Sequence, residues 1–274
     1  MPEGHTIHRL AREHKQLFGG EPVAASSPQG RFADGAVLLD GQPLTGTDAH
    51  GKHLFHRYGG DDSGGGNWLH VHLGLYGDFR TGVAPVPVPV GQIRLRLVGE
   101  RHWAELRGPT VCEVITDAEK DALHARLGPD PLRDDADPAA AWARISRSRT
   151  AIGRLLMDQE VIAGVGNVYR AEVLFRHGID PRLPGRELDR ASWQSIWDDL
   201  VALMREGVRV GRIDTVRPEH TPEAMGRPPR VDDHGGEVYV YRRHGQPCLL
   251  CGDEVRIEVV AARNLYWCPT CQPA

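Results

Sequence analysis

The sequence predicts an α+β protein with more than one domain, in which a β-sandwich or barrel is followed by helices and a cysteine-bearing hairpin. Three observations lead to this fold class. Short apolar or alternating runs between glycine-rich turns fill most of residues 1–130, helical spacing of apolar residues begins after Asp137, and two Cys-x-x-Cys pairs stand near the C-terminus. With 274 residues, 40% of them hydrophobic, the chain can form more than one ordinary core.

The N-terminal part opens with a predicted helix and continues with predicted strands. The helix spans Gly4 to Phe18, where an apolar stripe with the helical period ends at two glycines. The stretch from Val83 to Val90 has prolines at alternate positions, and we expect an extended surface loop because proline cannot donate to a sheet. The expected strands are Ala36 to Leu39, His53 to Tyr58, Trp68 to Leu73, Ile93 to Leu97 and Trp103 to Leu106.

The second part is expected to be helical. A polar segment follows it from Arg217 to Glu237, rich in proline, glycine and charge, and is expected to form a flexible loop. On its position alone, we hypothesise that this loop covers a binding pocket. The predicted helices are Pro138 to Ser146, Ala151 to Asp158, Asn167 to His177 and Ala191 to Glu206.

Four cysteines near the C-terminus have the spacing of a structural zinc site. Cys248 and Cys251 are followed, after sixteen residues, by Cys268 and Cys271, so two turns of a β-hairpin can surround one Zn²⁺ with four thiolates. A closed four-sulfur site performs no chemistry, but it would order the loop that carries Arg263. Two alternatives remain. The zinc could only tie down the tail, or the cysteines could form disulfides, which a fifth cysteine and the lack of an apolar signal core disfavour.

The charge composition does not have the bulk signature of a nucleic-acid-binding protein. The formal net charge is −4 and the isoelectric point about 6.4, which leaves only a local basic surface as a route to nucleic acid. Only three of the 33 basic residues are lysines: Lys15, Lys52 and Lys120. No stretch approaches the roughly 20 apolar residues of a membrane span, so no membrane partner is expected and the expected location is the cytoplasm.

The first residues offer a nucleophile. Removal of Met1 would leave Pro2 with a free secondary amine, and an α-amine has a pKa near 8, so much of it is reactive at neutral pH. Such an amine forms an iminium with an aldehyde carbon, and Glu3 stands beside it as a proton donor or acceptor. The alternative is structural, because proline and glutamate also suit the first turn of a helix.

A glycine-punctuated turn from Ile162 to Gly166 opens directly onto a predicted helix. Asn167 is expected to be the N-cap of that helix, whose N-terminus attracts anions, so a phosphate could dock there. The same residues could form a tight turn between two helices. The turn lacks the Gly-x-Gly-x-x-Gly spacing of a dinucleotide site.

Two further segments contain candidate residues. Lys52 lies in a glycine turn before a predicted strand, where a solvated turn lysine is the plain alternative. His70 and His72 could suggest a metal, but histidines on one face of a strand are more often packed side chains. Leu75 and Tyr76 could be a wedge that enters a base stack, with core packing as the alternative.

Together these motifs resemble the formamidopyrimidine-DNA glycosylase and endonuclease VIII family, and most closely its actinobacterial endonuclease VIII branch. The resemblance covers essentially the whole chain, and the order of the motifs is far more specific than any one of them. The matching segments are Met-Pro-Glu-Gly at the start, Gly51-Lys52, His72-Leu73-Gly74, the run from Met157 to Arg170, and the four-cysteine hairpin that ends Cys271-Gln272.

The resemblance implies a fold, an activity and roles for individual residues. The fold is an N-terminal β-sandwich with an opening helix, a helix-two-turn-helix domain and a β-hairpin zinc finger. Pro2 would attack C1′ of a damaged nucleotide and Glu3 would protonate the sugar oxygen. Lys52, Asn167 and Arg263 would hold phosphates around the everted nucleotide, an arrangement that base removal from a duplex requires.

The implied function is base-excision repair by a DNA glycosylase of oxidised bases, oxidised pyrimidines foremost, with abasic-site lyase cleavage by β,δ-elimination. The expected domains are residues 1–130, 131–223 and 224–274. The expected partner of a monomeric chain is damaged double-stranded DNA, with single-stranded or bubble DNA left open. The rival hypothesis is a protein that binds DNA damage with little turnover, and a purely structural zinc protein is a third.

Two departures from the family pattern bear on these expectations. Thr6 stands where many members carry a glutamate, which removes any accessory acid at that position. Gly74 stands where a glutamine precedes the Leu-Tyr pair in the best-known enzyme of the branch, so the preference for the opposite base cannot be carried over to Leu75 and Tyr76.

Overall fold

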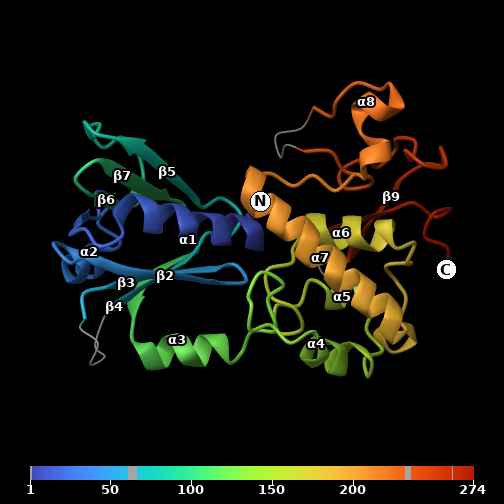
Figure 1. The fold of residues 1–274 in the computed structure, drawn as a ribbon, viewed down its shortest axis with the longest axis horizontal. Coiled ribbons are helices and arrows are strands. Elements are labelled where there is room, and N and C mark those ends of the chain that lie inside the picture. Colours follow the sequence, from blue (N-terminus) through green and yellow to red (C-terminus); the bar gives the residue numbers. More distant parts are fainter. Residues whose placement is uncertain (1, 61–66, 232–235, 261) are drawn as a thin grey trace. The chain divides into compact units, whose positions relative to one another are not determined.

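The computed structural model describes residues 2–60, 67–231, 236–260 and 262–274 (Figure 1). The chain divides into two compact units, Met1–Arg126 and Leu127–Ala274, and each is described by itself below.

The first unit consists of two four-stranded antiparallel sheets with three helices. One sheet has the order β2-β3-β4-β8 and the other β1-β6-β7-β5. The strands are β1 (Ala24–Ser26), β2 (Leu44–His50), β3 (His53–Tyr58), β4 (Asn67–His72), β5 (Asp78–Val83), β6 (Ile93–Val98), β7 (His102–Arg107) and β8 (Val111–Ile115), and the helices are α1 (Gly4–Phe18), α2 (Ala33–Leu39) and α3 (Asp117–His124).

The two sheets share one core, so this unit is the predicted β-sandwich. Alternate residues of facing strands are fully buried, among them Leu54 and Val71 from one sheet and Leu97 and Leu106 from the other. The opening helix α1 has the predicted bounds and adds its own stripe to this core, with Ile7, Ala11 and Phe18 buried. The helix therefore holds its N-terminal residues at a fixed place on the sandwich.

The predicted strand from Ala36 to Leu39 is wrong, because these residues belong to helix α2. Ala36 and Leu39, three positions apart, are buried, while Val37 and Leu38 are 76% and 51% exposed. This is helical spacing, which a four-residue apolar run cannot distinguish from a buried strand. Five elements of the unit were not predicted: β1, β2, β5, β8 and α3.

The alternating prolines form the predicted surface segment. Strand β5 ends at Val83, and the residues after it lie outside any strand until β6 begins. Val88 and Val90 are 82% and 72% exposed, while Arg107 donates to the carbonyl oxygen of Val90. The Arg107 hydrogen bond thus holds the backbone of this segment to the sheet, while the side chains of Val88 and Val90 are exposed to solvent.

The second unit packs its helices around one another and joins them to a C-terminal hairpin. Two of its helices match the predictions closely, α5 is shorter than predicted and α7 is longer. The elements are α4 (Pro138–Ile145), α5 (Ile152–Leu155), α6 (Asn167–Arg176), η1 (Gly185–Glu187), α7 (Arg190–Val210), η2 (Pro218–His220), α8 (Pro222–Met225), β9 (Arg256–Val260) and β10 (Arg263–Trp267).

Helix α7 illustrates how the sequence sets these elements. Its N-cap Asp189 accepts a hydrogen bond from the backbone N–H of Ser192, and Gly211 ends the helix in the left-handed conformation at φ 78°. Between them Trp193, Ile196, Trp197, Leu200 and Met204 form the buried stripe. Helix α6 is buried from Asn167 to Phe175 and is the centre of the unit.

Two expectations for this unit need correction. Asn167 is the first residue of α6, and the N-cap is Gly166, which frees the Asn167 side chain for longer-range bonds. The segment from Arg217 to Glu237 is not wholly irregular, since η2 and α8 form within it and Arg227 makes an ion pair of 2.7 Å with Glu237. Residues 232–235 of that segment lie outside the described residues.

Among the helices that the structure describes, none is long and apolar enough to cross a bilayer.

Candidate functional site

Pro2 and Glu3 lie where helix α1 begins. Glu3 is the N-cap residue, with an extended backbone, and its carbonyl accepts a hydrogen bond from the Thr6 N–H at 3.0 Å. The Glu3 side chain is fully buried, whereas Pro2 is only half-buried. The positive end of a helix dipole therefore lies beside an accessible amine position and a buried carboxyl group.

Lys52 occupies the turn between β2 and β3, after Gly51 at φ 59°. His53 pairs across the sheet with His72, so the Lys52 turn and the C-terminal end of β4 lie at the same end of the strands. Burial first, and then the positive charge of Lys52, lower the pKa of His72. This end of the sheet therefore presents a cationic lysine beside an imidazole that is neutral at neutral pH.

His70 is packed rather than metal-binding. Its Nε2 lies 2.8 Å from Nδ1 of His53, and its Nδ1 lies 2.9 Å from a carboxylate oxygen of Glu113. Its ring also stacks on Phe55, with centroids 5.0 Å apart. Within the described residues, these histidines do not form a group suited to a metal ion.

Leu75 and Tyr76 project from the turn that joins β4 to β5. They are 44% and 87% exposed, while Leu73 just before them is buried. The turn is closed by a hydrogen bond of 3.0 Å from the Gly77 N–H to the Leu73 carbonyl, and Gly74 has a φ of 68°. Two large apolar side chains are therefore held outward on a short, anchored turn, the arrangement that a wedge requires.

The glycine-rich turn before α6 is organised by Gln159. Its amide donates to the carbonyl oxygens of Met157 and Val165, and its carbonyl accepts from the Gly164 N–H at 3.0 Å. Gly164 has a φ of 87°, a conformation that a residue with a side chain rarely adopts. One side chain thus sets the path of the turn that leads to Asn167.

Asn167 is connected to the C-terminal hairpin through Asn264. The Asn167 amide donates to the Asn264 carbonyl at 3.0 Å, and Arg170 donates to the same carbonyl at 3.0 Å. Arg170 also donates to the side-chain oxygen of Asn167. Asn264 follows Arg263, the half-buried first residue of β10, so the structure brings the predicted residues Asn167 and Arg263 to one place in this unit.

The helix α6 makes a second connection to the segment before the hairpin. The buried Glu172 carboxylate accepts hydrogen bonds from the successive backbone N–H groups of Tyr239, Val240 and Tyr241 and from the Thr215 hydroxyl. A carboxylate that accepts four such bonds is well satisfied in the interior. Glu172 and Arg170 were not singled out as site residues from the sequence; for Arg170, its i,i+3 spacing from Asn167 on a helix was the available signal.

The four predicted cysteines gather at the end of the hairpin, and their sulfur atoms all lie within 4.8 Å of one another. Cys251 and Cys268 are 3.4 Å apart, and Cys248 and Cys271 are 3.8 Å apart. Tetrahedral zinc with Zn–S bonds of about 2.3 Å requires sulfur separations of about 3.8 Å. Cys248 and Cys268 are buried, so these thiolates fit one structural zinc ion.

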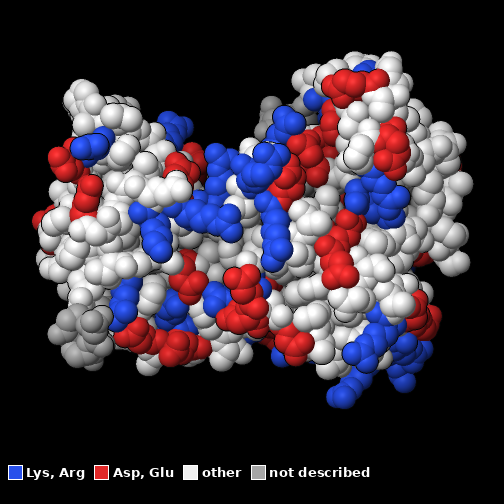
Figure 2. All heavy atoms as spheres, viewed as in Figure 1, with Lys and Arg blue, Asp and Glu red and all other residues white. Residues whose placement is uncertain are grey.

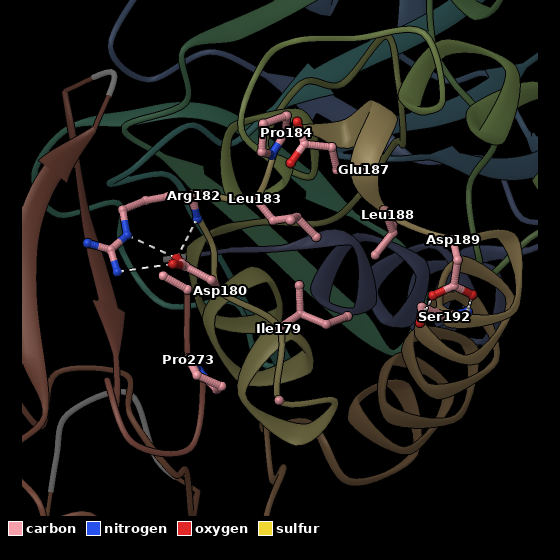
Figure 3. A pocket seen from close by; sticks show the side chains of 12 residues that line it. Ile179, Asp180, Arg182, Leu183, Pro184, Glu187, Leu188, Asp189, Ser192 and Pro273 are labelled. Atoms are coloured by element: carbon pink, nitrogen blue, oxygen red, sulfur yellow. Dashed lines mark hydrogen bonds and ion pairs between the residues drawn. The ribbon is translucent and has the colours of Figure 1, made fainter.

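A cavity of about 610 Å³ in the second unit is separate from the predicted site residues (Figure 3). Its carboxylates already have partners: Asp180 binds Arg182 at 2.9 Å, and Asp189 accepts from Ser192 at 2.9 and 2.6 Å (Figure 3). None of its lining residues carries one of the chemical roles predicted above.

On the face drawn in Figure 2, basic side chains lie among acidic ones in both units, consistent with the mixed composition.

Pro2, Glu3, Lys52, Leu75 and Tyr76 thus belong to the sandwich unit. Asn167, Arg263 and the four cysteines belong to the helical unit. The first unit therefore carries an amine beside a carboxyl group, a lysine and an exposed wedge, and the second carries hydrogen-bond donors joined to the hairpin that holds the four cysteines.

Three family models match the chain in succession. The formamidopyrimidine-DNA glycosylase N-terminal domain matches residues 1–110, the H2TH domain of the same glycosylase matches residues 127–218, and the zinc finger found in FPG and IleRS matches residues 245–274. The chain belongs to the formamidopyrimidine-DNA glycosylase and endonuclease VIII family.

Individual relatives agree with this family. Endonuclease 8 1 of Mycobacterium tuberculosis is 54% identical over 99% of this chain and 100% of the relative. Probable endonuclease 8 2 of Streptomyces coelicolor is 33% identical over 99% of this chain and 94% of the relative. A Lactococcus lactis Fpg structure in complex with DNA that contains an abasic site has the same fold, with a TM-score of 0.79 at 23% identity over 99% of this chain and 100% of that chain.

Proposed function

We propose that the chain removes oxidised bases, oxidised pyrimidines foremost, from damaged double-stranded DNA through a covalent intermediate on Pro2. It is a DNA glycosylase of base-excision repair with abasic-site lyase activity, the activities of the family to which it belongs. The observation that carries the assignment of Pro2 is its half-buried position at the start of α1, directly before the fully buried Glu3.

The chemistry follows from the amine. The Pro2 nitrogen attacks C1′ of the nucleotide and gives up its proton, the bond from C1′ to the base breaks, and the base leaves with the bonding electrons and takes up a proton. Glu3 gives a proton to the sugar ring oxygen as the ring opens, which leaves an iminium between Pro2 and C1′. The iminium acidifies the hydrogen on C2′, so its loss expels the 3′ phosphate, and a second elimination expels the 5′ phosphate.

Grip on the DNA is assigned to other residues. Lys52, Asn167 and Arg263 hold phosphates around the everted nucleotide, and Leu75 and Tyr76 fill the space that it leaves. The support for this assignment is that Lys52 and the exposed wedge lie on anchored turns, while Asn167 and Arg263 are joined through Asn264.

Zinc has a structural role in this proposal. The four cysteines would hold it, and in a closed four-sulfur site it orders the hairpin rather than reacting. Residues 1–130 would then carry the chemistry, while residues 131–223 and 224–274 would bind the DNA backbone. A monomer that acts in the cytoplasm on nucleoid DNA, with double-stranded DNA as its substrate and single-stranded or bubble DNA as a further candidate substrate, completes the proposal.

Borohydride trapping tests the proposal. The protein is incubated with end-labelled duplexes that carry an abasic site or thymine glycol, and reduction fixes any iminium as a stable adduct. The matched control is the same protein with an uncleaved N-terminal extension, in which Pro2 is no longer a free amine. We expect adducts on both duplexes for the free N-terminus and none for the blocked protein.

The other outcomes are equally informative. Adducts that persist in the blocked protein would assign the nucleophile to another residue. Tight, lesion-selective binding with no adduct would replace the enzyme by the damage-binding protein considered above, for which Thr6 in place of the family glutamate is the available sequence feature. No preference for damaged DNA would refute both.

A further inference from the structure

We propose that Arg170 is a positioning residue that fixes the amide orientation of Asn167 and holds Asn167 beside the hairpin strand that begins at Arg263. The inference rests on the proposed function, since it gives Asn167 and Arg263 the task of binding phosphates. Arg170 itself is 1% exposed, so its effect on DNA passes through its neighbours.

The first step concerns the two ends of the Asn167 side chain. A primary amide has an oxygen that accepts and a nitrogen that donates, and rotation by half a turn exchanges them. Arg170 carries only donors, so the end of the amide that faces it must be the oxygen, and Arg170 does donate to Asn167 Oδ1. The guanidinium therefore selects one of the two amide orientations.

The selected orientation gives the site its preference for anions. With its oxygen turned to Arg170, Asn167 directs Nδ2 to the Asn264 carbonyl at 3.0 Å and keeps a second N–H for another acceptor. The opposite orientation would turn an oxygen toward the hairpin carbonyl and toward any phosphate, and both contacts would be repulsive. Arg170 and the Asn264 carbonyl thus together hold the amide orientation in which Asn167 can bind a phosphate.

The second step concerns the hairpin. Arg170 donates to the Asn264 carbonyl at 3.0 Å and to the Gly153 carbonyl at 3.2 Å, so one planar fork joins α6, the first turn of α5 and β10. Asn264 directly follows Arg263, so the same bonds fix the start of β10. Lysine could not reproduce this, because its single ammonium group lacks the rigid fork.

A double-mutant cycle measures whether the two residues act as one. The variants are Asn167→Ala, Arg170→Met, both together, and Arg170→Lys. The ligand is a duplex with a stable abasic-site analogue, so that turnover does not disturb the dissociation constant. We expect each single change to weaken binding about tenfold, the loss of one charged hydrogen bond, and the double variant to be no weaker than about tenfold.

Three further measurements distinguish a positioning role of Arg170 from a general loss of stability. Arg170→Lys should behave like Arg170→Met, although it keeps the charge. Bound zinc and the trapped fraction at saturating abasic DNA should stay at the wild-type level, because Pro2 belongs to the other unit. Arg176→Met is the matched control: Arg176 lies on the same helix and binds Asp199 at 2.6 Å, so its loss should reduce stability without changing affinity.

Several results would overturn the inference. An additive, roughly hundredfold loss in the double variant would make Arg170 an independent DNA contact. If Arg170→Lys kept the full affinity, the positive charge of Arg170 alone would explain its role. If Arg170→Met lost zinc, Arg170 would be needed for folding of the hairpin rather than for positioning Asn167. An Asn167→Ala variant with unchanged affinity would remove the phosphate role of Asn167 and this inference with it. Failure of trapping by the wild type would refute the proposed chemistry alone, since the affinity cycle would still report the coupling.

Discussion

A buried pair of histidines is predicted to make the first unit sensitive to acid. His14, on α1, lies in the sandwich core with its Nδ1 3.0 Å from Nε2 of His56, and its ring meets that of Phe79 with centroids 4.6 Å apart. Burial lowers the pKa of His14 to about 4, from the usual value of 6.5, and burial followed by the charge of His14 lowers the pKa of His56 well below its usual value. Both rings are therefore neutral in the folded protein at neutral pH.

The sign of the pH effect follows from these pKa values. The unfolded chain binds protons on His14 below pH 6.5, but the folded chain does so only below about pH 4, so stability falls as pH drops through this window. The gap corresponds to about 3.4 kcal/mol at about 1.36 kcal/mol per pH unit. Protonation of His14 alone should make the free energy of unfolding about 2 kcal/mol lower at pH 5 than at pH 8.

The assay must follow the sandwich separately from the other unit. The protein is equilibrated in urea at pH 8 or pH 5, given a brief deuterium pulse at one common pH, and digested, and the peptides that contain β3 are weighed. With a urea m-value of about 2 kcal/mol/M, His14 should lower the midpoint by about 1 M at pH 5.

The variant His14→Leu with His56→Leu is the test of the cause. It removes both imidazoles together, so neither leaves the other unpaired, and the difference between pH 8 and pH 5 should shrink by at least about 2 kcal/mol. A wild-type midpoint that is equal at the two pH values would refute the reasoning. So would an undiminished difference in the double variant.

Three other perturbations follow from the geometry. Glu172→Gln turns an amide N–H₂ toward the backbone donors of residues 239–241 and should destabilise that segment by about 2 kcal/mol, measured by hydrogen exchange of its peptides. Gly74→Ala places a methyl group at φ 68° against Thr110 Oγ1. This change should lower the free energy of unfolding by at least about 1 kcal/mol and slow base removal, and the Tm and the single-turnover rate measure the two effects. Cys251→Ser should lose the zinc and weaken DNA binding at least about tenfold, with trapping at saturating DNA retained, as metal analysis and binding assays would report.

The sequence predicted those elements whose signal is local. Helix α1 was predicted correctly because its apolar stripe is long and Gly19 ends it. Strand β2 was missed because only Leu44 and Ala49 of its seven residues are buried, which leaves no clear alternation. Helix α2 was mistaken for a strand because its apolar run is too short to show a period.

The site divides in the same way. The cysteine spacing is a local pattern, and the structure brings these cysteines together as the spacing requires. The role inferred for Arg170 could not be predicted, because its partner Asn264 lies 94 residues away and the bond goes to a backbone carbonyl, which has no sequence signature. For the same reason Asn167 was assigned as an N-cap, whereas its amide is directed to the hairpin.

The distribution of residues between the units predicts how variants will differ in kinetics. The amine and the carboxyl group assigned to the chemistry lie on the sandwich, whereas the Asn167 and Arg170 bonds to the hairpin lie entirely within the helical unit. A change in the second group removes binding that is present before and during the reaction, so it should raise KM and leave kcat nearly unchanged. A change at Pro2 or Glu3 removes an interaction made only during the reaction, so it should lower kcat with KM unchanged. Because DNA at saturation compensates for the first kind of loss and not for the second, the trapped fraction at saturation distinguishes the two groups residue by residue.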